Sequence, residues 1–255
     1  MFLSVLHINA GNNPDRPRPG TSWLRNVYRV HQRLCMAFPS AARVAEDPDY
    51  LNPFDPDDFG TGNVHVERGA NAGFLYRIDP RPGSGVMILV QSALEPNWEY
   101  AFHNAGYLLT SSPKVEGYEP SFHSGDLLRF RLVANPTRRL SKNSREADGT
   151  FVKAESVKKR VPVPVDQLEH WLVRRGGTSG FAIPSNSFTV QPGYVFMSKK
   201  ANGRGQRVRT ARYEGILVVT DSELLVESVA SGIGPAKAFG CGLLTVIPTH
   251  KGDAT

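Results

Sequence analysis

Apolar and polar positions in the first half of the chain predict strands around one helix. Residues 1–10 (MFLSVLHINA) form a short, β-compatible segment. After a loop rich in Pro and Gly, Thr21 or Ser22 can cap a helix that runs to about Phe38, and Pro39 ends it. The apolar stripe of this helix consists of Trp23, Val27, Val30, Leu34 and Phe38. Further strands are expected at residues 64–66, 72–79 and 86–94.

The second half repeats the mixture of strands and helices. It starts with a strand at 127–135, where Leu128, Phe130 and Leu132 alternate with a face that carries basic residues. A basic loop runs to Arg160, and Asp166 then caps a helix that Gly176 ends. Asp221 caps a second helix. Strands are expected near 181–190, 193–200, 206–219 and 242–248, with a hairpin turn at 201–205.

The order of these elements predicts the fold class. A strand, a helix, two or more strands, a weak helix and a strand follow one another roughly twice. This order is typical of two tandem ferredoxin-like (RRM-like) domains of the α+β class. Turn residues cluster between Gly117 and Gly125, and the charge changes sign there. We therefore expect one domain at residues 1–118 and another at 124–250.

The distribution of charge indicates a polyanionic partner. The chain has 255 residues and a formal net charge of +6. Residues 1–120 hold 10 Lys/Arg and 13 Asp/Glu, whereas residues 121–255 hold 20 and 11. The excess is concentrated at 129–160, with 10 Lys/Arg against 3 Asp/Glu, and at 199–212, with 6 Lys/Arg and no acid. Such blocks attract nucleic acid because neutralised phosphates release counterions. A solvated basic surface is the other interpretation.

Composition and motifs narrow the possible chemistry. Only Cys35 and Cys241 are present, which argues against a disulfide scaffold or a multi-cysteine metal site and favours a cytoplasmic location. No apolar run is long enough to span a bilayer, and the N-terminal segment does not have the pattern of a signal peptide. No zinc-binding His–Glu motif is present. We expect no cofactor, no metal and no membrane partner.

A glycine-rich run precedes the last predicted strand. The sequence GIGPAKAFGCG places Gly232, Gly234, Gly240 and Gly242 around Lys237. Glycine lets backbone N–H groups approach a phosphate, and Lys237 could add charge. The run is not a Walker A loop, because no Gly-Lys-Ser/Thr closes it. A tight loop that leads into a strand is the alternative interpretation.

This run and four other stretches resemble one family. SVASGIGPAKAFGCGLLTVIP (228–248) is similar to the C-terminal signature of the CRISPR repeat-processing endoribonucleases, in the type I-E form called CasE, a subunit of Cascade. The other stretches agree in chain order: VLHINAGN, NVYRVHQRLCMAF, QSALEPNW and FRLVANPTRR. Together the matches span nearly the full length, and the ordered set is far more specific than a glycine loop alone.

The resemblance implies a reaction and its residues. The family has two ferredoxin-like domains, binds the hairpin of a CRISPR repeat and cuts at the 3′ base of the stem without metal. The ribose 2′-OH attacks the adjacent phosphate and leaves a 2′,3′-cyclic phosphate. His31 matches the catalytic histidine, as general base or acid, and Tyr28 matches its companion tyrosine. The implied partners are the repeat hairpin and other Cascade subunits. Because His31 falls inside the apolar stripe, a structural core histidine is the alternative.

Candidate RNA contacts come from the basic blocks and the glycine-rich run. They are Arg138, Arg139, Lys158, Lys159, Arg160, Lys199, Lys200, Arg204 and Arg207, together with Gly232, Gly234, Lys237, Gly240 and Gly242. A folded stem is read mainly by its shape and phosphates, and the sequence has no clear RNP1-type aromatic signature for single strands. Two stretches, 45–62 and 143–150, are longer than the family pattern and could dock a neighbouring subunit.

Three other functions compete with the metal-independent endoribonuclease. A non-cleaving subunit would bind the hairpin and leave it intact. A metal-dependent nuclease would need clustered carboxylates, for which Asp55, Asp57 and Asp58 are the only candidates. A structural interaction protein would use its basic face on another protein, and salt-sensitive RNA affinity would argue against it.

Overall fold

The computed structural model describes residues 1–11, 18–40, 73–80, 85–140, 160–199 and 205–249. The first sheet contains β1 (Phe2–Ile8), β2 (Phe74–Pro80), β3 (Val86–Ser92) and β4 (Lys114–Gly117), in the order β2-β3-β1-β4. Every pairing in it is antiparallel. With a helical segment after β1 and another after β3, this is the ferredoxin-like βαββαβ arrangement.

The helix expected from Thr21 or Ser22 to Phe38 is two helices, and that prediction was wrong. α1 (Pro19–Leu24) ends before Asn26, and α2 (Val27–Cys35) starts after it. Asn26 has extended backbone, and its side chain accepts a hydrogen bond from Tyr28 N, so it caps a new helix. Thr21 instead donates its hydroxyl to the Ala10 carbonyl. The later helical segment is α4 (Trp98–Phe102) followed by a 3₁₀ turn, η2 (Gly106–Leu108).

The second sheet has the same topology and confirms the fold class. Its strands β11 (Leu244–Pro248), β5 (Leu127–Ala134), β10 (Gln206–Val219) and β8 (Phe181–Ala182) follow one another, and β9 (Phe188–Met197) also pairs with β10. α5 (Leu168–Gly176) and α6 (Ser222–Ser231) cover it. The strands of the two sheets lie within 2–117 and 127–248. The domain limits 1–118 and 124–250 stay a prediction.

Local predictions for the second half had mixed outcomes. Asp221 caps α6 as expected, through a hydrogen bond from Leu224 N. Asp166 caps nothing, because it lies inside a 3₁₀ turn, η4 (Val165–Gln167), that leads into α5. The predicted basic loop begins and ends in a two-stranded ribbon, β6 (Thr137–Arg139) with β7 (Arg160–Pro162). The expected strand at 64–66, most of the hairpin turn at 201–205 and the stretches 45–62 and 143–150 lie outside the described residues.

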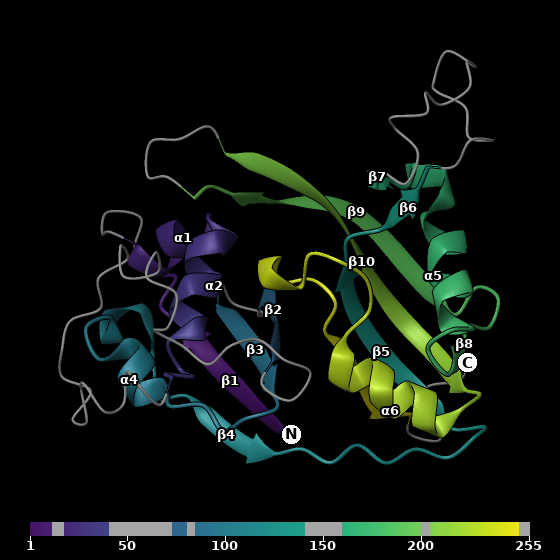
Figure 1. Ribbon diagram of the computed structural model, residues 1–255, viewed down its shortest axis with the longest axis horizontal. Helices are drawn as coiled ribbons and strands as arrows, with labels where there is room; N and C mark the ends of the chain where they lie inside the picture. Colours follow the sequence, from purple (N-terminus) through teal and green to yellow (C-terminus); the bar gives the residue numbers. More distant parts are fainter. Residues whose placement is uncertain (12–17, 41–72, 81–84, 141–159, 200–204, 250–255) are drawn as a thin grey trace.

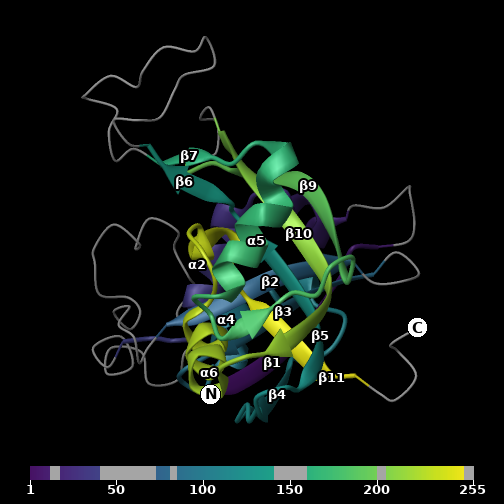
Figure 2. The same cartoon turned by 90° about the vertical axis from the view of Figure 1, so that its right-hand side faces the viewer.

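Besides the chain itself, several contacts join the two sheets, and two of them involve α2. The β9–β10 hairpin reaches across to α2, and the glycine-rich segment with its 3₁₀ turn η5 (Lys237–Phe239) lies between α2 and the second sheet (Figure 1). Figure 2 shows the β6–β7 ribbon beyond the end of β5. Each half has its own apolar core. Among the described helices, none is long and apolar enough to cross a membrane.

Candidate active site and RNA interface

The start of α2 is fixed by contacts with the other half of the molecule. The Asn26 side chain caps the helix and also bonds the end of β9: its Nδ2 donates to the Ser198 carbonyl at 2.9 Å, and its Oδ1 accepts from Ser198 N at 3.0 Å. Tyr28 follows in the first turn, half-buried, and His31 lies one turn later. The hairpin that carries Lys199 is therefore held beside the helix that carries both candidate catalytic residues.

His31 lies at the edge of an aromatic cluster and is partly exposed. Its ring stacks on Phe74, with centroids 5.5 Å apart, and is nearly parallel to Tyr76 at 6.4 Å. Cys35 Sγ lies 3.5 Å from the ring nitrogen Nε2. These contacts limit the orientations that the imidazole ring can adopt. His31 belongs to the apolar stripe, as its spacing indicates, but it is not sealed in the core.

Tyr76 connects α2 to the glycine-rich segment. This residue is fully buried, and its hydroxyl lies within hydrogen-bonding distance of two carbonyls, 3.0 Å from Val27 O and 3.1 Å from Ala238 O. A single hydroxyl proton is shared between these acceptors. A Cβ added at Gly240 would lie 3.2 Å from the Tyr76 ring. One side chain thus touches the candidate catalytic helix, the His31 ring and the loop.

All four glycines of the run have positive φ angles, between 77° and 96°. Gly232 lies so close to Leu75 of β2 that an added Cβ would be 2.8 Å from it. Gly242 accepts a hydrogen bond from Ile233 N and donates one to Val133 O. Glycine is required here by backbone conformation and close packing. Phosphate contact by this loop stays a prediction.

Lys237 is engaged within the protein. Its ammonium group donates a hydrogen bond to the Ser231 carbonyl at the end of α6, and burial lowers the pKa of this lysine. To reach a phosphate, the side chain would have to leave that carbonyl. Within the same segment, Cys241 is fully buried, and burial raises the pKa of its thiol to about 12, which fits an apolar filler.

The basic candidates fall into two groups. Arg139 and Arg160 are exposed and directly opposite each other in the β6–β7 ribbon, with Arg138 half-buried beside them. Like charges in such a cross-strand pair repel, and an anion would relieve the repulsion. Lys199 and Arg207 are exposed on the hairpin. Lys158, Lys159, Lys200 and Arg204 lie outside the described residues.

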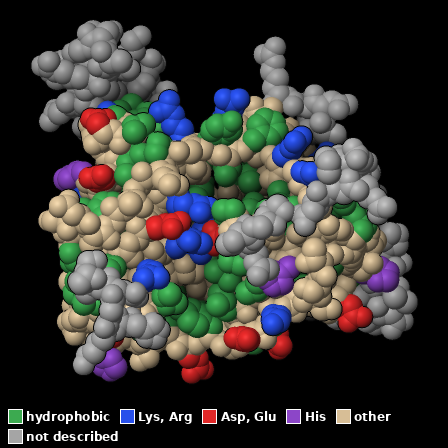
Figure 3. Space-filling view, turned by 180° about the vertical axis from the view of Figure 1, so that it is seen from behind, with side chains coloured by type: hydrophobic (Ala, Val, Ile, Leu, Met, Phe, Trp, Pro, Cys, Tyr) green, Lys and Arg blue, Asp and Glu red, His purple; other side chains and the backbone are tan. Residues whose placement is uncertain are grey.

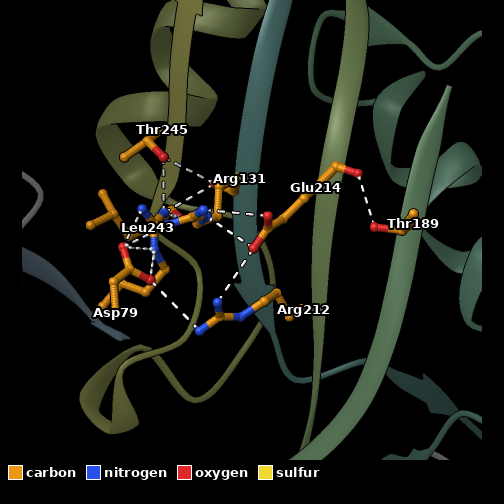
Figure 4. Close-up of polar contacts among 8 residues, drawn as sticks. Asp79, Arg131, Thr189, Arg212, Glu214, Leu243 and Thr245 are labelled. Atoms are coloured by element: carbon orange, nitrogen blue, oxygen red, sulfur yellow. Dashed lines mark hydrogen bonds and ion pairs between the residues drawn. The ribbon is translucent and has the colours of Figure 1, made fainter. Parts of the chain in front are cut away.

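Sequence reasoning missed a charged cluster between the two sheets. The Asp79 side chain is fully buried and forms an ion pair with Arg77 at 2.8 Å. Arg131 and Arg212 lie 3.6 and 3.8 Å from the same carboxylate, and both also pair with Glu214 (Figure 4). Burial lowers the pKa of Arg77, while Asp79 opposes that shift. Arg77 also donates to the Leu243 carbonyl and to the Thr245 hydroxyl, so the cluster binds β2 to the second sheet.

This cluster borders a hollow on the rear face. Figure 3 shows basic and acidic side chains together above a hollow with hydrophobic walls. A cavity of about 1010 Å³ lies there, lined by residues from β5, β9, β10 and β11 and including Arg77, Arg131 and Glu214. The described ranges contain no group of three or more His, Cys, Asp or Glu side chains placed to hold a metal ion, and Asp55, Asp57 and Asp58 lie outside those ranges.

Comparison with known proteins places the chain in a family. A family model described as "CRISPR associated protein" matches residues 1–248. The CRISPR system Cascade subunit CasE of Escherichia coli is 27% identical over 230 residues, which cover 89% of this chain and 94% of that protein. The CRISPR-associated endoribonuclease Cse3 of Thermus thermophilus is 30% identical over 213 residues, covering 78% and 92%. The chain belongs to the type I-E CasE family of CRISPR-associated proteins.

Solved structures of CasE-family relatives share the arrangement. Cse3 of Thermus thermophilus bound to an RNA that represents a pre-cleavage complex has a TM-score of 0.64 and 26% identity, covering 97% of this chain and 98% of the relative. CRISPR endoribonuclease Cse3 bound to a 19-nucleotide RNA has a TM-score of 0.65, also at 26% identity, with 97% and 99% coverage. The CasE-family match extends over α2, the glycine-rich segment and both sheets.

The structure brings together part of the predicted site of this CasE-family chain. His31 and the glycine-rich segment meet around Tyr76, Tyr28 lies one turn before His31 on α2, and Lys199 follows Ser198, which is bonded to the cap of α2. The β6–β7 ribbon, which carries Arg139, belongs to the other half of the molecule. Asn135, just before the ribbon, donates a hydrogen bond to the Arg209 carbonyl of β10. Tyr76 and Phe74 were not singled out from the sequence, because buried aromatic residues in a strand look like ordinary core.

Proposed function

We propose that this chain binds the hairpin of a CRISPR repeat in precursor RNA and cuts it at the 3′ base of the stem. The observation that supports this most is the family match over residues 1–248, together with a partly exposed His31 held beside the glycine-rich segment. Its relatives are named as an endoribonuclease and a Cascade subunit. We further propose that the chain acts in the cytoplasm with other Cascade subunits.

In the proposed reaction, the ribose 2′ oxygen attacks the adjacent phosphorus and the 5′ oxygen leaves. A base removes the proton of the 2′-OH, and an acid gives a proton to the 5′ oxygen, so the products are a 2′,3′-cyclic phosphate and a 5′-OH. His31 performs one of these transfers, since an imidazole changes its charge near neutral pH. Tyr28, one turn away on α2, orients or donates to the phosphate. The basic residues of the ribbon and hairpin bind the RNA through its phosphates.

The test of this reaction is single-turnover cleavage of the host's own repeat RNA in excess EDTA, followed by analysis of the product ends. A matched RNA with 2′-deoxyribose at the cut site lacks the attacking group. We expect the first RNA to be cut to a 2′,3′-cyclic phosphate end and the second to remain intact. Tight binding without cleavage would contradict the proposed endoribonuclease activity and favour a non-cleaving RNA-binding subunit. Cleavage that EDTA abolishes would contradict a metal-independent reaction.

A further inference from the structure

The β9–β10 hairpin exposes aromatic and cationic side chains on one face. Tyr194 and Phe196 lie on the same face of β9, and Arg207 and Arg209 are their cross-strand partners on β10. We call these four residues the hairpin stripe. Tyr194 is 60% exposed and Phe196 is 39% exposed, whereas most large apolar side chains of the described residues are buried. Both arginines are exposed as well.

Side chains of the hairpin stripe pack against other residues of the hairpin. The Arg207 guanidinium lies over the Tyr194 ring, 4.7 Å from its centroid, which is cation–π geometry. The Phe196 ring lies against Gly205, where an added Cβ would come within 2.0 Å of it. No acidic residue occurs between Lys199 and Arg212 to neutralise the arginines. The result is a cationic surface with two partly exposed aromatic rings.

The hairpin stripe has a fixed position relative to the candidate active site. At one end of the hairpin, Ser198 is bonded to Asn26, which caps the helix of Tyr28 and His31. Farther along, the Arg209 carbonyl accepts a hydrogen bond from Asn135 at 2.6 Å, next to the β6–β7 ribbon. RNA that contacts both the ribbon and α2 would pass along this hairpin.

The chemistry of the hairpin stripe differs from that of a stem-binding surface. Bases inside an A-form stem are stacked on one another and offer no face to a side chain, so a stem is contacted through its phosphates and hydroxyl groups. Unpaired bases stack on aromatic rings and on guanidinium planes. We propose that the hairpin stripe binds single-stranded nucleotides that adjoin the stem, with bases on Tyr194 and Phe196 and phosphates at Arg207 and Arg209. This inference rests on the proposed function and names a second part of its substrate.

The experiment measures equilibrium binding of the full chain to three RNAs, each with 2′-deoxyribose at the cut site so that none is cleaved. The first is the repeat stem-loop alone, the second adds its natural single-stranded flanks, and the third has flanks with abasic nucleotides. We expect the flanked RNA to bind at least about 5-fold tighter than the stem-loop, which is the lower range for one base stacked on a ring, and the abasic flanks to lose that gain.

Two variants test whether the hairpin stripe causes the higher affinity for flanked RNA. Tyr194→Ala should remove the advantage of the flanks and leave the affinity for the stem-loop unchanged. Tyr107→Ala is the matched control, since Tyr107 is 62% exposed but lies in the first half of the chain, and it should change neither affinity. Thermal unfolding checks that both variants fold.

The inference is overturned if wild-type protein binds flanked RNA and stem-loop RNA with equal affinity. The flanks would then not contact the hairpin stripe, and a protein partner would be the other occupant. The inference is also overturned if RNA with abasic flanks binds as tightly as RNA with natural flanks. The same holds if Tyr194→Ala weakens binding of the stem-loop as much as binding of the flanked RNA. Failure of wild-type protein to bind the stem-loop at all is a separate result, which contradicts the proposed function itself.

Discussion

At the scale of single residues, the hydroxyl of Tyr76 is the contact that most directly connects α2 to the glycine-rich segment. It lies within hydrogen-bonding distance of the Val27 carbonyl at the start of α2 and of the Ala238 carbonyl in η5. The ring of the same residue is nearly parallel to that of His31. Tyr76 is therefore a positioning residue for the proposed catalytic histidine.

Tyr76→Phe keeps the ring and removes one hydrogen-bonding group. We expect the free energy of unfolding to fall by about 1 kcal/mol, the usual net value of such a bond, and single-turnover cleavage to slow while RNA affinity stays constant. Tyr213→Phe is the control, because Tyr213 is also fully buried and donates to the Leu168 carbonyl at 3.1 Å, within the second core. Urea unfolding and cleavage are measured on both. Equal slowing in the two variants would contradict a positioning role for Tyr76.

At the scale of elements, the glycine-rich segment is a packed connection between the two halves. Its positive φ angles and its contacts with Leu75 and Tyr76 explain why glycines are required, irrespective of any phosphate. The sequence alone could not separate these roles, since a turn with positive φ and a phosphate-binding loop favour the same residue. The break between α1 and α2 was also not predictable, because the apolar stripe continues through it. The hydrogen bonds between Asn26 and Ser198, which are distant in sequence, show why the helix restarts there.

Gly240→Ala tests whether contact with Tyr76 matters beyond backbone strain. Gly240 has φ 78° and a neighbouring ring, whereas Gly125 has φ 91° and nothing within 4 Å of an added Cβ. Both alanine variants should lose about 1 kcal/mol of stability because of the left-handed backbone. Only Gly240→Ala should also slow cleavage, because its methyl group pushes on Tyr76. If cleavage by the Gly240 variant matches that of the Gly125 variant at equal stability, the contact is irrelevant to the reaction.

At the scale of the whole molecule, periodicity and residue order predicted two α+β units of one topology, and the two sheets confirm this. The prediction was possible because the strands and helices of each unit bury their apolar faces in that unit's own core. The way the units meet was not predictable, because Arg77 and Asp79 are two positions apart in an otherwise apolar strand and their partners Arg131 and Arg212 are far away in sequence. Only the folded chain brings these charges together.

Asp79→Asn removes the buried negative charge from the cluster and leaves Arg77 without its ion pair. We expect a loss of about 3 kcal/mol in the free energy of unfolding, as when one partner of a buried pair is removed. Asp126→Asn is the comparison, because Asp126 is 41% exposed and pairs with His123 at the surface, so a loss below about 1 kcal/mol is expected. Urea unfolding of both variants gives the difference. A similar small loss in both would show that the cluster does not hold the two units together.

His31 is proposed to transfer a proton during cleavage, and a comparison of RNA cleavage with RNA binding tests that role. Single-turnover cleavage and equilibrium binding of the repeat hairpin are measured for wild type, His31→Ala and His103→Ala, an exposed histidine of the same half. We expect His31→Ala to cut about 100- to 10,000-fold more slowly with unchanged affinity, and His103→Ala to behave as wild type. Cleavage by His31→Ala at the wild-type rate would contradict that role and leave His31 as part of the aromatic core.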